Sequence, residues 1–212
     1  MMILVLDTET TGLPDRLKFN DFYDYSFSRY YSGSRVIELA CVLYNNEGNI
    51  LQKHSWLISS EGVEIPPFIT GLTGITQEMV KESGVSLDTV VPVFKELLDQ
   101  ASVLVMHNAK FDRYVLAAEL YRTGYHELAL EFFNKPYACT MEMGKQYTAI
   151  KTRSGFLKYP KLQELYMHFF HEPFESSHRA LADVLATGQC YLRMMPLIPQ
   201  KEEEVNQVSQ SL

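Results

Sequence analysis

Two carboxylates stand at the end of the first hydrophobic run of the chain. Asp7 and Glu9 follow the apolar segment 3–6 within "MMILVLDTETTGLP", and such a continuous apolar run predicts a buried strand. Side chains two residues apart on a strand leave the same face, so these carboxylates are expected to lie side by side. Like charges this close repel each other unless a cation lies between them, and the pattern therefore indicates a metal site.

Two further segments place acids at the ends of expected elements. Asp112 lies in the first turns of the helix that follows "SVLVMHNA", and Asp183 lies early in the last helix, five residues after His178. Carboxylate oxygens suit Mg²⁺ or Mn²⁺. Four carboxylates can hold two such ions roughly 4 Å apart, an arrangement that serves phosphoryl hydrolysis. The sequence thus predicts two divalent cations, Mg²⁺ or Mn²⁺, as cofactors.

Taken singly, each of these residues has a simpler structural explanation. Asp7 fits a strand-end turn, and Asp112 fits a first-turn acid at the positive end of a helix dipole. Asp183 fits an acid on a helix surface, and His178 fits a loop histidine. Each of them nevertheless lies within a specific local pattern, "DTETTGL", "HNAKFD" or "HRALAD". The functional interpretation depends on the three patterns occurring together.

The three patterns resemble those of the DEDDh branch of the DEDD (DnaQ-like) 3′→5′ exonucleases, the group that includes the proofreading epsilon subunit of bacterial replicative polymerase. The resemblance runs from about Ile3 to Met194, with the segment after Leu13 as its main departure, and "RVIELACV", "LTGIT" and "CT" also match. It implies an α/β fold, an RNase H-like mixed five-stranded sheet flanked by helices, with the third strand at one edge and the second antiparallel to its neighbours. The sibling branch has tyrosine where Arg179 stands, which favours the histidine branch.

The resemblance also implies roles for individual residues. Asp7, Glu9, Asp112 and Asp183 are implied to be the metal ligands, and His178 the general base. A second set is implied to contact the terminal nucleotide, its phosphate or the strand behind it, namely Thr10, Leu13, Leu72, Thr73, Ile75, His107, Asn108 and Phe111. Many relatives carry histidine where Thr73 stands.

The implied activity is metal-dependent hydrolysis of terminal nucleotides from single-stranded or frayed 3′ ends of DNA, with release of nucleoside 5′-monophosphates. Relatives of the oligoribonuclease type usually carry methionine after the first glutamate, so Thr10 favours DNA, and hydrolysis of short RNA is the alternative. A phosphatase with an aspartyl nucleophile would carry a second aspartate in place of Glu9. A catalytically silent nucleic-acid-binding module is disfavoured, because all five residues expected for catalysis are present.

Hydrophobic patterns and turn residues predict the elements that position these residues. Strands are expected at 3–6, 35–44, 50–59, 102–107 and 136–140. Helices are expected at 77–83, 89–100, 109–124, 140–149, 161–171 and 178–195. Thr76 and Asn108 are the expected caps, Pro92 is expected in a first turn, and 71–76 is expected to be a loop. The alternation of strands and helices is typical of an α/β protein.

Composition and charge narrow the class of protein. With 212 residues, 46% of them hydrophobic, the chain suits a single domain, which the resemblance implies is an exonuclease domain over 1–196. An irregular insertion is expected at 15–34 and a flexible polar tail at 197–212. Three scattered cysteines fit neither a disulfide framework nor a zinc site and indicate the cytoplasm. The apolar run at the start is too short to span a membrane. The net charge of −7 disfavours nucleic acid as a partner, but bound metal would neutralise four of the carboxylates.

Three segments of the sequence can each be interpreted in two ways. The basic stretch from Lys145 to Lys161 is interleaved with aromatic residues and is either a solvated loop or a surface that follows a nucleic acid strand. The aromatic rings of the insertion either stack on substrate bases or pack on their own domain. The final "QVSQSL" faintly resembles peptides that dock on a sliding clamp, so a polymerase or a clamp is a further candidate partner, and a plain disordered tail is the simpler interpretation.

Overall fold

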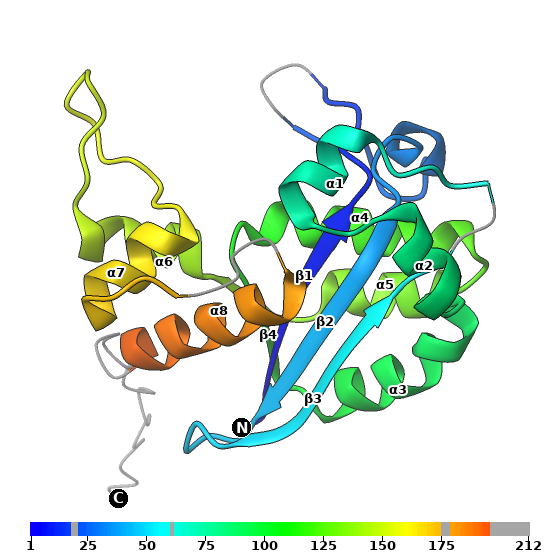
Figure 1. The fold of residues 1–212 in the computed structure, drawn as a ribbon. Helices are drawn as coiled ribbons and strands as arrows, with labels where there is room; N and C mark the ends of the chain where they lie inside the picture. The colour runs from blue at the N-terminus through cyan, green and yellow to red at the C-terminus, as the bar shows by residue number, and fades with distance from the viewer. Residues whose placement is uncertain (18–20, 60–61, 175–178, 196–212) are drawn as a thin grey trace, which may run out of the picture.

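A mixed sheet forms the centre of the protein. The computed structural model describes residues 1–17, 21–59, 62–174 and 179–195 (Figure 1). Within these residues five strands are arranged in the order β3-β2-β1-β4-β5. They are β1 (Ile3–Thr10), β2 (Val36–Tyr44), β3 (Ile50–Leu57), β4 (Val103–Met106) and β5 (Tyr137–Cys139). β2 runs antiparallel to β1 and β3, whereas β4 and β5 run parallel to β1. The predicted five-stranded sheet with its third strand at one edge is confirmed.

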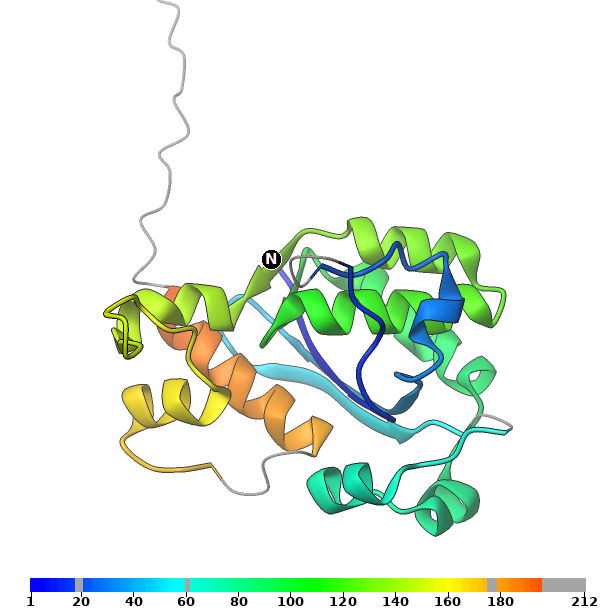
Figure 2. The same cartoon turned by 90° about the horizontal axis from the view of Figure 1, so that it is seen from above.

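Helices cover both faces of this sheet. The α-helices of the described residues are α1 (Pro67–Thr73), α2 (Gln77–Ser83), α3 (Leu87–Gln100), α4 (Ala109–Arg122), α5 (His126–Asn134), α6 (Thr140–Thr148), α7 (Leu162–Phe170) and α8 (Ala180–Met194). Seen from above, α4 and α5 lie on one side of the strands and α8 lies on the other (Figure 2). α7 packs on the outer side of α8. None of the helices in the described part of the chain is long and apolar enough to cross a bilayer.

Alternate residues of β1 face different helical layers. Leu4 and Leu6 join the core beneath α3, α4 and α5, whereas Ile3 and Val5 join the core beneath α8. The alternation of a strand carries this pattern onward, so Asp7 and Glu9 point toward the layer of α8. α8 comes close to the sheet at Gly188, where a Cβ atom would lie 2.7 Å from the hydroxyl oxygen of Tyr44. The first two predicted ligands therefore face the helix that carries the last one.

The structure corrects several predicted boundaries. β1 continues to Thr10, because its pairing with β2 extends past the apolar run. α3 begins at Leu87, so Pro92 lies inside the helix, and the prediction of a first-turn proline is wrong. The cap of α2 is confirmed, since the Thr76 side chain accepts a hydrogen bond from the Met79 amide.

Two short helices were not predicted. Segment 71–76 was expected to be a loop, but its first three residues complete α1, which begins at Pro67 and ends before Gly74 in a left-handed conformation. Proline at the start and glycine after the end are helix signals that were present in the sequence. α5 is likewise absent from the prediction. α5 buries Leu128, Ala129 and Phe132, an apolar spacing that was also present in the sequence.

Aromatic rings of the insertion pack on their own domain in the part that the structure describes. Phe22 and Tyr25 are buried, and their rings lie 5.5 Å from the ring of Tyr114 and 4.7 Å from that of Phe133. Tyr31 is buried within the same core. These contacts favour packing over base stacking for the buried rings. Phe19 lies outside the described residues, as do residues 196–212 with the clamp-like peptide.

A buried ion-pair network fixes the insertion and the start of β2 to α4. Glu119 is 1% exposed and accepts hydrogen bonds from the guanidinium groups of Arg35, at 2.6 Å, and Arg122, at 2.8 Å. Arg122 also donates to the carbonyl oxygen of Ser28 in the insertion, at 2.6 Å. One carboxylate of α4 thus holds two segments that are distant from it in sequence.

We expect Glu119→Ala to lower the free energy of unfolding by about 3–5 kcal/mol, because two guanidinium groups would lose their buried partner. Urea denaturation measures this change. Asp99→Ala is the matched control, since Asp99 pairs with Lys95 at an exposed site and its loss should cost less than about 1 kcal/mol. Equal losses in the two variants would contradict the assigned role of the network.

Candidate active site

Three carboxylates from two distant segments meet at the end of the sheet. Oxygen atoms of Asp7, Glu9 and Asp183 all lie within 4.8 Å of one another. β1 contributes the first two, and the first turn of α8 contributes the third. All three side chains are partly buried. The structure therefore brings together three of the four predicted metal ligands.

The electrostatics of this cluster favour a cation. Burial raises the pKa of Asp7 well above its usual range, and the charges of Asp112, Asp183 and Glu9 raise it further. Burial, and then Asp183 and Glu38, raise the pKa of Glu9 from 4.5 to about 8. Carboxylate oxygens that repel one another in a partly buried site are the donor set of a hard divalent cation. The residues present fit Mg²⁺ or Mn²⁺.

Asp112 approaches from the opposite helical layer. It is 2% exposed, and its Oδ1 accepts hydrogen bonds from the amide of Thr8, at 3.0 Å, and from the Thr8 hydroxyl, at 2.8 Å. Burial raises the pKa of Asp112 to about 7, although the bonds from Thr8 act to lower it. Asp112 is not part of the three-residue cluster, but its charge raises the pKa of Asp7. Its assignment as a fourth ligand stays a prediction.

Glu38 anchors the start of α8 and was not predicted as a functional residue. It is 1% exposed and lies opposite Glu9 on β2. Its carboxylate accepts hydrogen bonds from the amide of Ala180, at 3.2 Å, and from Arg179, at 3.3 Å. The Ser55 hydroxyl donates a further bond at 3.0 Å. A glutamate inside an otherwise apolar strand was the available signal, because buried charges are normally paired.

A pocket of about 670 Å³ opens beside the carboxylates and contains two more predicted residues, His107 and Asn108. The carbonyl of Pro160 lies 3.1 Å from Nε2 of His107, and Oγ1 of Thr140 lies 2.9 Å from Nδ1. Because a carbonyl can only accept, Nε2 carries the proton of the neutral ring, and the hydroxyl donates to Nδ1. Burial lowers the pKa of His107 to about 4, so the ring is neutral near pH 7.

Asn108 occupies the N-cap position of α4 but makes no capping hydrogen bond with its side chain, so that part of the prediction is wrong. Its backbone is left-handed, with φ of 69° and ψ of 47°. Asparagine tolerates this conformation better than most residues, and a non-glycine residue held in it is often found at a functional site.

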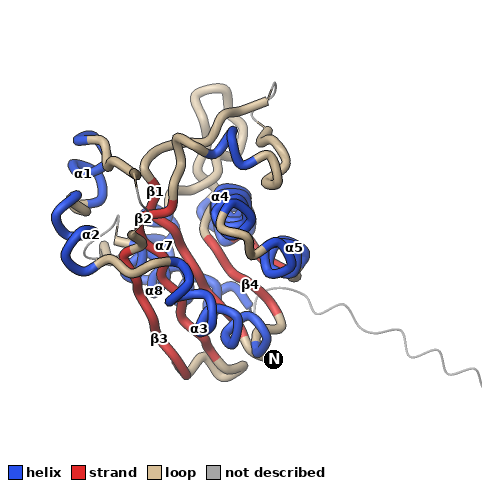
Figure 3. The backbone as a smooth tube through the Cα atoms, turned by 90° about the vertical axis from the view of Figure 1, so that its right-hand side faces the viewer, coloured by secondary structure: helices blue, strands red, loops and turns tan. Residues whose placement is uncertain are grey.

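A second pocket, of about 640 Å³, lies on the other side of the strand end and shares Thr8 and Glu9 with the first. α1 lies beside the end of β1 (Figure 3). Residues of α1 form one wall of this pocket. Five of the predicted substrate-contacting residues line it, namely Thr10, Leu13, Leu72, Thr73 and Phe111. Phe68 and Ile69 of α1 also line it and were not predicted. Apolar side chains that remain exposed, such as Leu13 and Phe68, suit a flat apolar ligand.

Among the described residues, two predicted site residues, Asp112 and Ile75, line neither pocket. Ile75 is fully buried in a core cluster with Ile37 and Ile69, so the structure does not bring it to the pocket surface. His178 lies outside the described residues, just before Arg179, which is the N-cap of α8. Its role stays a prediction.

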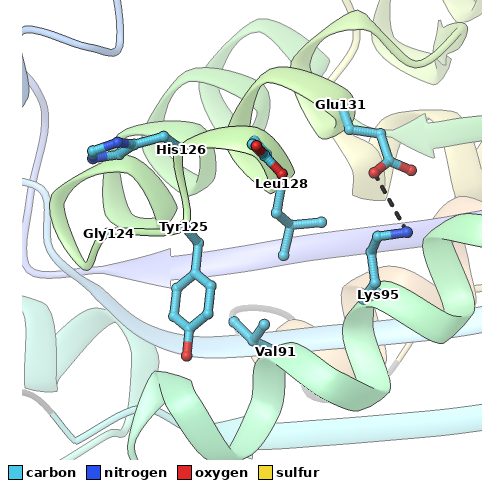
Figure 4. A pocket seen from close by; sticks show the side chains of 8 residues that line it. Val91, Lys95, Gly124, Tyr125, His126, Leu128 and Glu131 are labelled. Atoms are coloured by element: carbon cyan, nitrogen blue, oxygen red, sulfur yellow. Dashed lines mark ion pairs between the residues drawn. The ribbon is translucent and has the colours of Figure 1, made fainter.

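A third pocket, of about 590 Å³, lies between α3 and the start of α5 (Figure 4). Its lining includes Val91, Tyr125 and Leu128, and Lys95 points toward Glu131 with 3.5 Å between Nζ and Oε2. None of the predicted site residues lines it. The candidate active site is therefore the pair of pockets that meet at Glu9.

Comparison with known proteins places these features in a family. The model of the exonuclease family RNase_T matches residues 4–191. DNA polymerase III PolC-type of Thermotoga petrophila is 29% identical over 195 residues, which are 92% of this chain and 12% of that protein. The 3′-5′ exonuclease DinG of Bacillus subtilis is 29% identical over 197 residues, which are 93% of this chain and 18% of that protein. The chain thus spans less than a fifth of either relative.

Solved structures share the fold. Escherichia coli exonuclease I in complex with a dT13 oligonucleotide superposes with a TM-score of 0.68 at 17% sequence identity. The match covers 91% of this chain and 40% of that one. The predicted RNase H-like arrangement is consistent with this likeness.

In EDTA, we expect the melting temperature to fall as the pH rises from about 4.5 to 8. The pKa values of Asp7, Glu9 and Asp112 are raised in the folded state, so the folded chain holds protons more tightly than the unfolded chain over this range. The stability present below pH 4.5 is therefore lost as these carboxyls ionise. Differential scanning calorimetry with and without Mn²⁺ measures the effect, and Mn²⁺ should reverse the loss at pH 8. Glu9→Gln should flatten the profile, whereas a flat profile in the unaltered protein would contradict the assigned repulsion.

We expect Glu38→Ala to weaken Mn²⁺ binding by roughly 10- to 100-fold, the usual effect of losing a residue that orients a ligand-bearing segment. Without its bonds to Arg179 and Ala180, the first turn of α8 no longer holds Asp183 beside β1. Isothermal titration with Mn²⁺ measures the affinity. Ser55→Ala is the matched control, because it removes one bond to Glu38 and leaves those to α8 intact. Unchanged affinity in Glu38→Ala would remove Glu38 from the support of the site.

Proposed function

The chain belongs to the RNase_T exonuclease family, and from that membership we propose that it is a metal-dependent 3′→5′ exonuclease that acts on single-stranded or frayed 3′ ends of DNA. One observation carries the proposal. The carboxylate cluster and the apolar pocket meet at Thr8 and Glu9, which line both pockets. A nucleotide whose base and sugar enter the apolar pocket would present its phosphodiester bond at the carboxylates.

The apolar pocket supports binding of a terminal nucleotide without selection of its base. Leu13, Leu72 and Phe111 line it, and two of these side chains are more than two-fifths exposed. Every base offers an apolar face that can stack on such side chains. Thr10 and Thr73 use their hydroxyl groups to bond carbonyl oxygens of their own chain, those of Gly12 and Ile69. Base-specific hydrogen bonds are therefore not expected from these two residues.

We propose that two divalent cations are the cofactors, with Asp7, Glu9, Asp112 and Asp183 as their ligands. When bound, such ions neutralise developing charge on the phosphate and the leaving oxygen. The carboxylates contribute by holding the positive charge at one place at the end of β1. Both Mg²⁺ and Mn²⁺ suit this set of oxygen donors.

We assign the general base to His178, which would remove the proton from the attacking water. His107 is the histidine that lines the described part of the candidate site, and its environment argues against that role. Both of its ring nitrogens are engaged, and its pKa is lowered to about 4, so it has little capacity to take up a proton at pH 7. His107 is better suited to positioning Pro160.

The relatives support DNA as the substrate. Two of them carry the names DNA polymerase III PolC-type and 3′-5′ exonuclease DinG, and a solved structure of similar fold holds a dT13 oligonucleotide. The likeness to PolC also supports association with a polymerase. Short RNA is the alternative substrate that the same pockets could hold.

Degradation of 5′-labelled substrates tests the proposal. Single-stranded DNA, duplex DNA with a mismatched 3′ end, and short RNA are incubated with Mg²⁺ or Mn²⁺ and with EDTA. We expect single-nucleotide shortening from the 3′ end of both DNA substrates, faster than that of RNA, and none in EDTA. Shortening in EDTA would overturn the metal-dependent mechanism, and faster degradation of RNA would overturn DNA as the substrate.

We expect Asp183→Asn and His178→Ala to differ in kind. Asp183→Asn removes a metal ligand, so Mn²⁺ affinity and turnover are lost together. His178→Ala removes only the proton acceptor, so Mn²⁺ affinity is kept while the single-turnover rate falls by roughly 10²–10⁴-fold. Single-turnover kinetics, Mn²⁺ titration and melting temperature are measured on both variants. If His178→Ala lowers only the melting temperature, His178 has a structural role instead.

A further inference from the structure

A hairpin rises from the rim of the carboxylate pocket, between α6 and α7. We name residues 150–161 the basic hairpin. Lys151 bridges Leu157, and the amide of Thr152 donates to the carbonyl of Phe156 at 2.8 Å. Gly155 closes the turn with φ of 86°, a conformation that glycine adopts easily. Figure 1 shows this segment projecting away from the sheet at the upper left. The hairpin is therefore an ordered element with its own hydrogen bonds.

The base of the hairpin is fixed at the candidate active site. Tyr159, Pro160 and Lys161 line the same pocket as Asp7 and Asp183. The hydrogen bond between Pro160 and the ring of His107 ties this base to the end of β4.

The same arm is also tied to α7. Nζ of Lys158 lies 2.6 Å from a carboxylate oxygen of Glu164, and the amide of Lys161 donates to the other oxygen of that carboxylate at 2.7 Å. A nucleic acid strand that leaves the carboxylates on this side would therefore meet a hairpin whose base is held in place by the end of β4 and by α7.

The outer side chains of the hairpin are cationic and aromatic. The basic hairpin contains four of the 19 lysines and arginines of the chain and no aspartate or glutamate, although the net charge of the protein is −7. Lys151 and Arg153 are exposed near the turn. Phe156 is 74% exposed and Tyr159 is 51% exposed. Exposed rings alternating with cations are the combination that binds the bases and phosphates of a single strand.

We propose that the basic hairpin binds the single-stranded DNA segment on the 5′ side of the terminal nucleotide. The proposal rests on the proposed function, because it assumes that the phosphodiester bond lies at the carboxylates. Tyr159 would contact the nucleotide next to that bond, and Phe156 would stack on a base further along. Lys151 and Arg153 would bind phosphates. Phe156 and Tyr159 lie on the same arm of the hairpin. Three residues of an extended arm span about 10 Å, which exceeds the length of one nucleotide.

An acidic protein segment is the other polyanion that such a surface could bind. Two observations favour the nucleic acid. The surface is continuous with the carboxylate pocket through Tyr159 and Lys161. It also presents two large exposed rings, and base stacking uses ring faces more fully than acidic side chains do.

The proposal is tested by measuring the binding of a labelled oligo-dT of about twelve nucleotides. Fluorescence anisotropy reports the affinity, with Ca²⁺ in place of Mg²⁺. The triple variant Lys151→Ala/Arg153→Ala/Phe156→Ala should bind at least tenfold more weakly. Loss of two phosphate contacts should also reduce the slope of log affinity against log salt by about 1.4. The control variant Lys53→Ala/Lys81→Ala removes two exposed lysines on β3 and α2 and should bind like the unaltered protein.

A second variant and a short substrate separate the outcomes. Phe156→Trp keeps an aromatic face and should bind oligo-dT as the unaltered protein does, whereas Phe156→Ala alone should weaken binding. Hydrolysis of a thymidine dinucleotide, which is too short to reach Phe156, reports the proposed function separately. Unchanged oligo-dT binding by the triple variant overturns the role of the hairpin, whether or not the dinucleotide is hydrolysed. A loss confined to single-stranded RNA, or to an acidic peptide, overturns the assignment to DNA.

Discussion

Repulsion among Asp7, Glu9 and Asp183 is the constraint on which the arrangement of the site depends. Their oxygens lie within 4.8 Å of one another in a partly buried place, which is unfavourable until a cation neutralises them. The chain separates Asp183 from the other two by most of its length, so tertiary contacts must hold it there. Asp183 is held there by the packing of α8 on the sheet and by the hydrogen bonds that Glu38 accepts from the start of that helix.

The site uses both faces of one strand. Asp7 and Glu9 point toward the layer of α8, while Thr8 between them faces α4 and holds Asp112 with two hydrogen bonds. A single stretch of β1 therefore presents two acids to the layer of α8 and fixes a third, Asp112, that comes from α4. The two pockets meet at the same stretch, which places an apolar surface for a base directly beside the carboxylates.

Charge is distributed unevenly around this site. When its carboxylates are ionised the site is negative, and a polyanionic substrate would then be repelled without metal. The base of the basic hairpin lines the same pocket as these carboxylates and is tied to it through Pro160 and His107. Bound cations would thus act on the bond to be cleaved. The hairpin would bind the nucleotides of the same DNA strand on the 5′ side of that bond.

The sequence by itself indicated the strands, their order through the family patterns, and the acids of the proposed metal site. These features are local, because apolar runs, i and i+2 spacing and short motifs are complete within a few residues. Only the tertiary structure decided that α1 forms a wall of the apolar pocket, that Ile75 is buried and that Glu38 anchors the start of α8. It also decided that the buried aromatic rings in the described part of the insertion pack on their own domain. Each of these depends on contacts between segments far apart in the chain, and no local pattern contains that information.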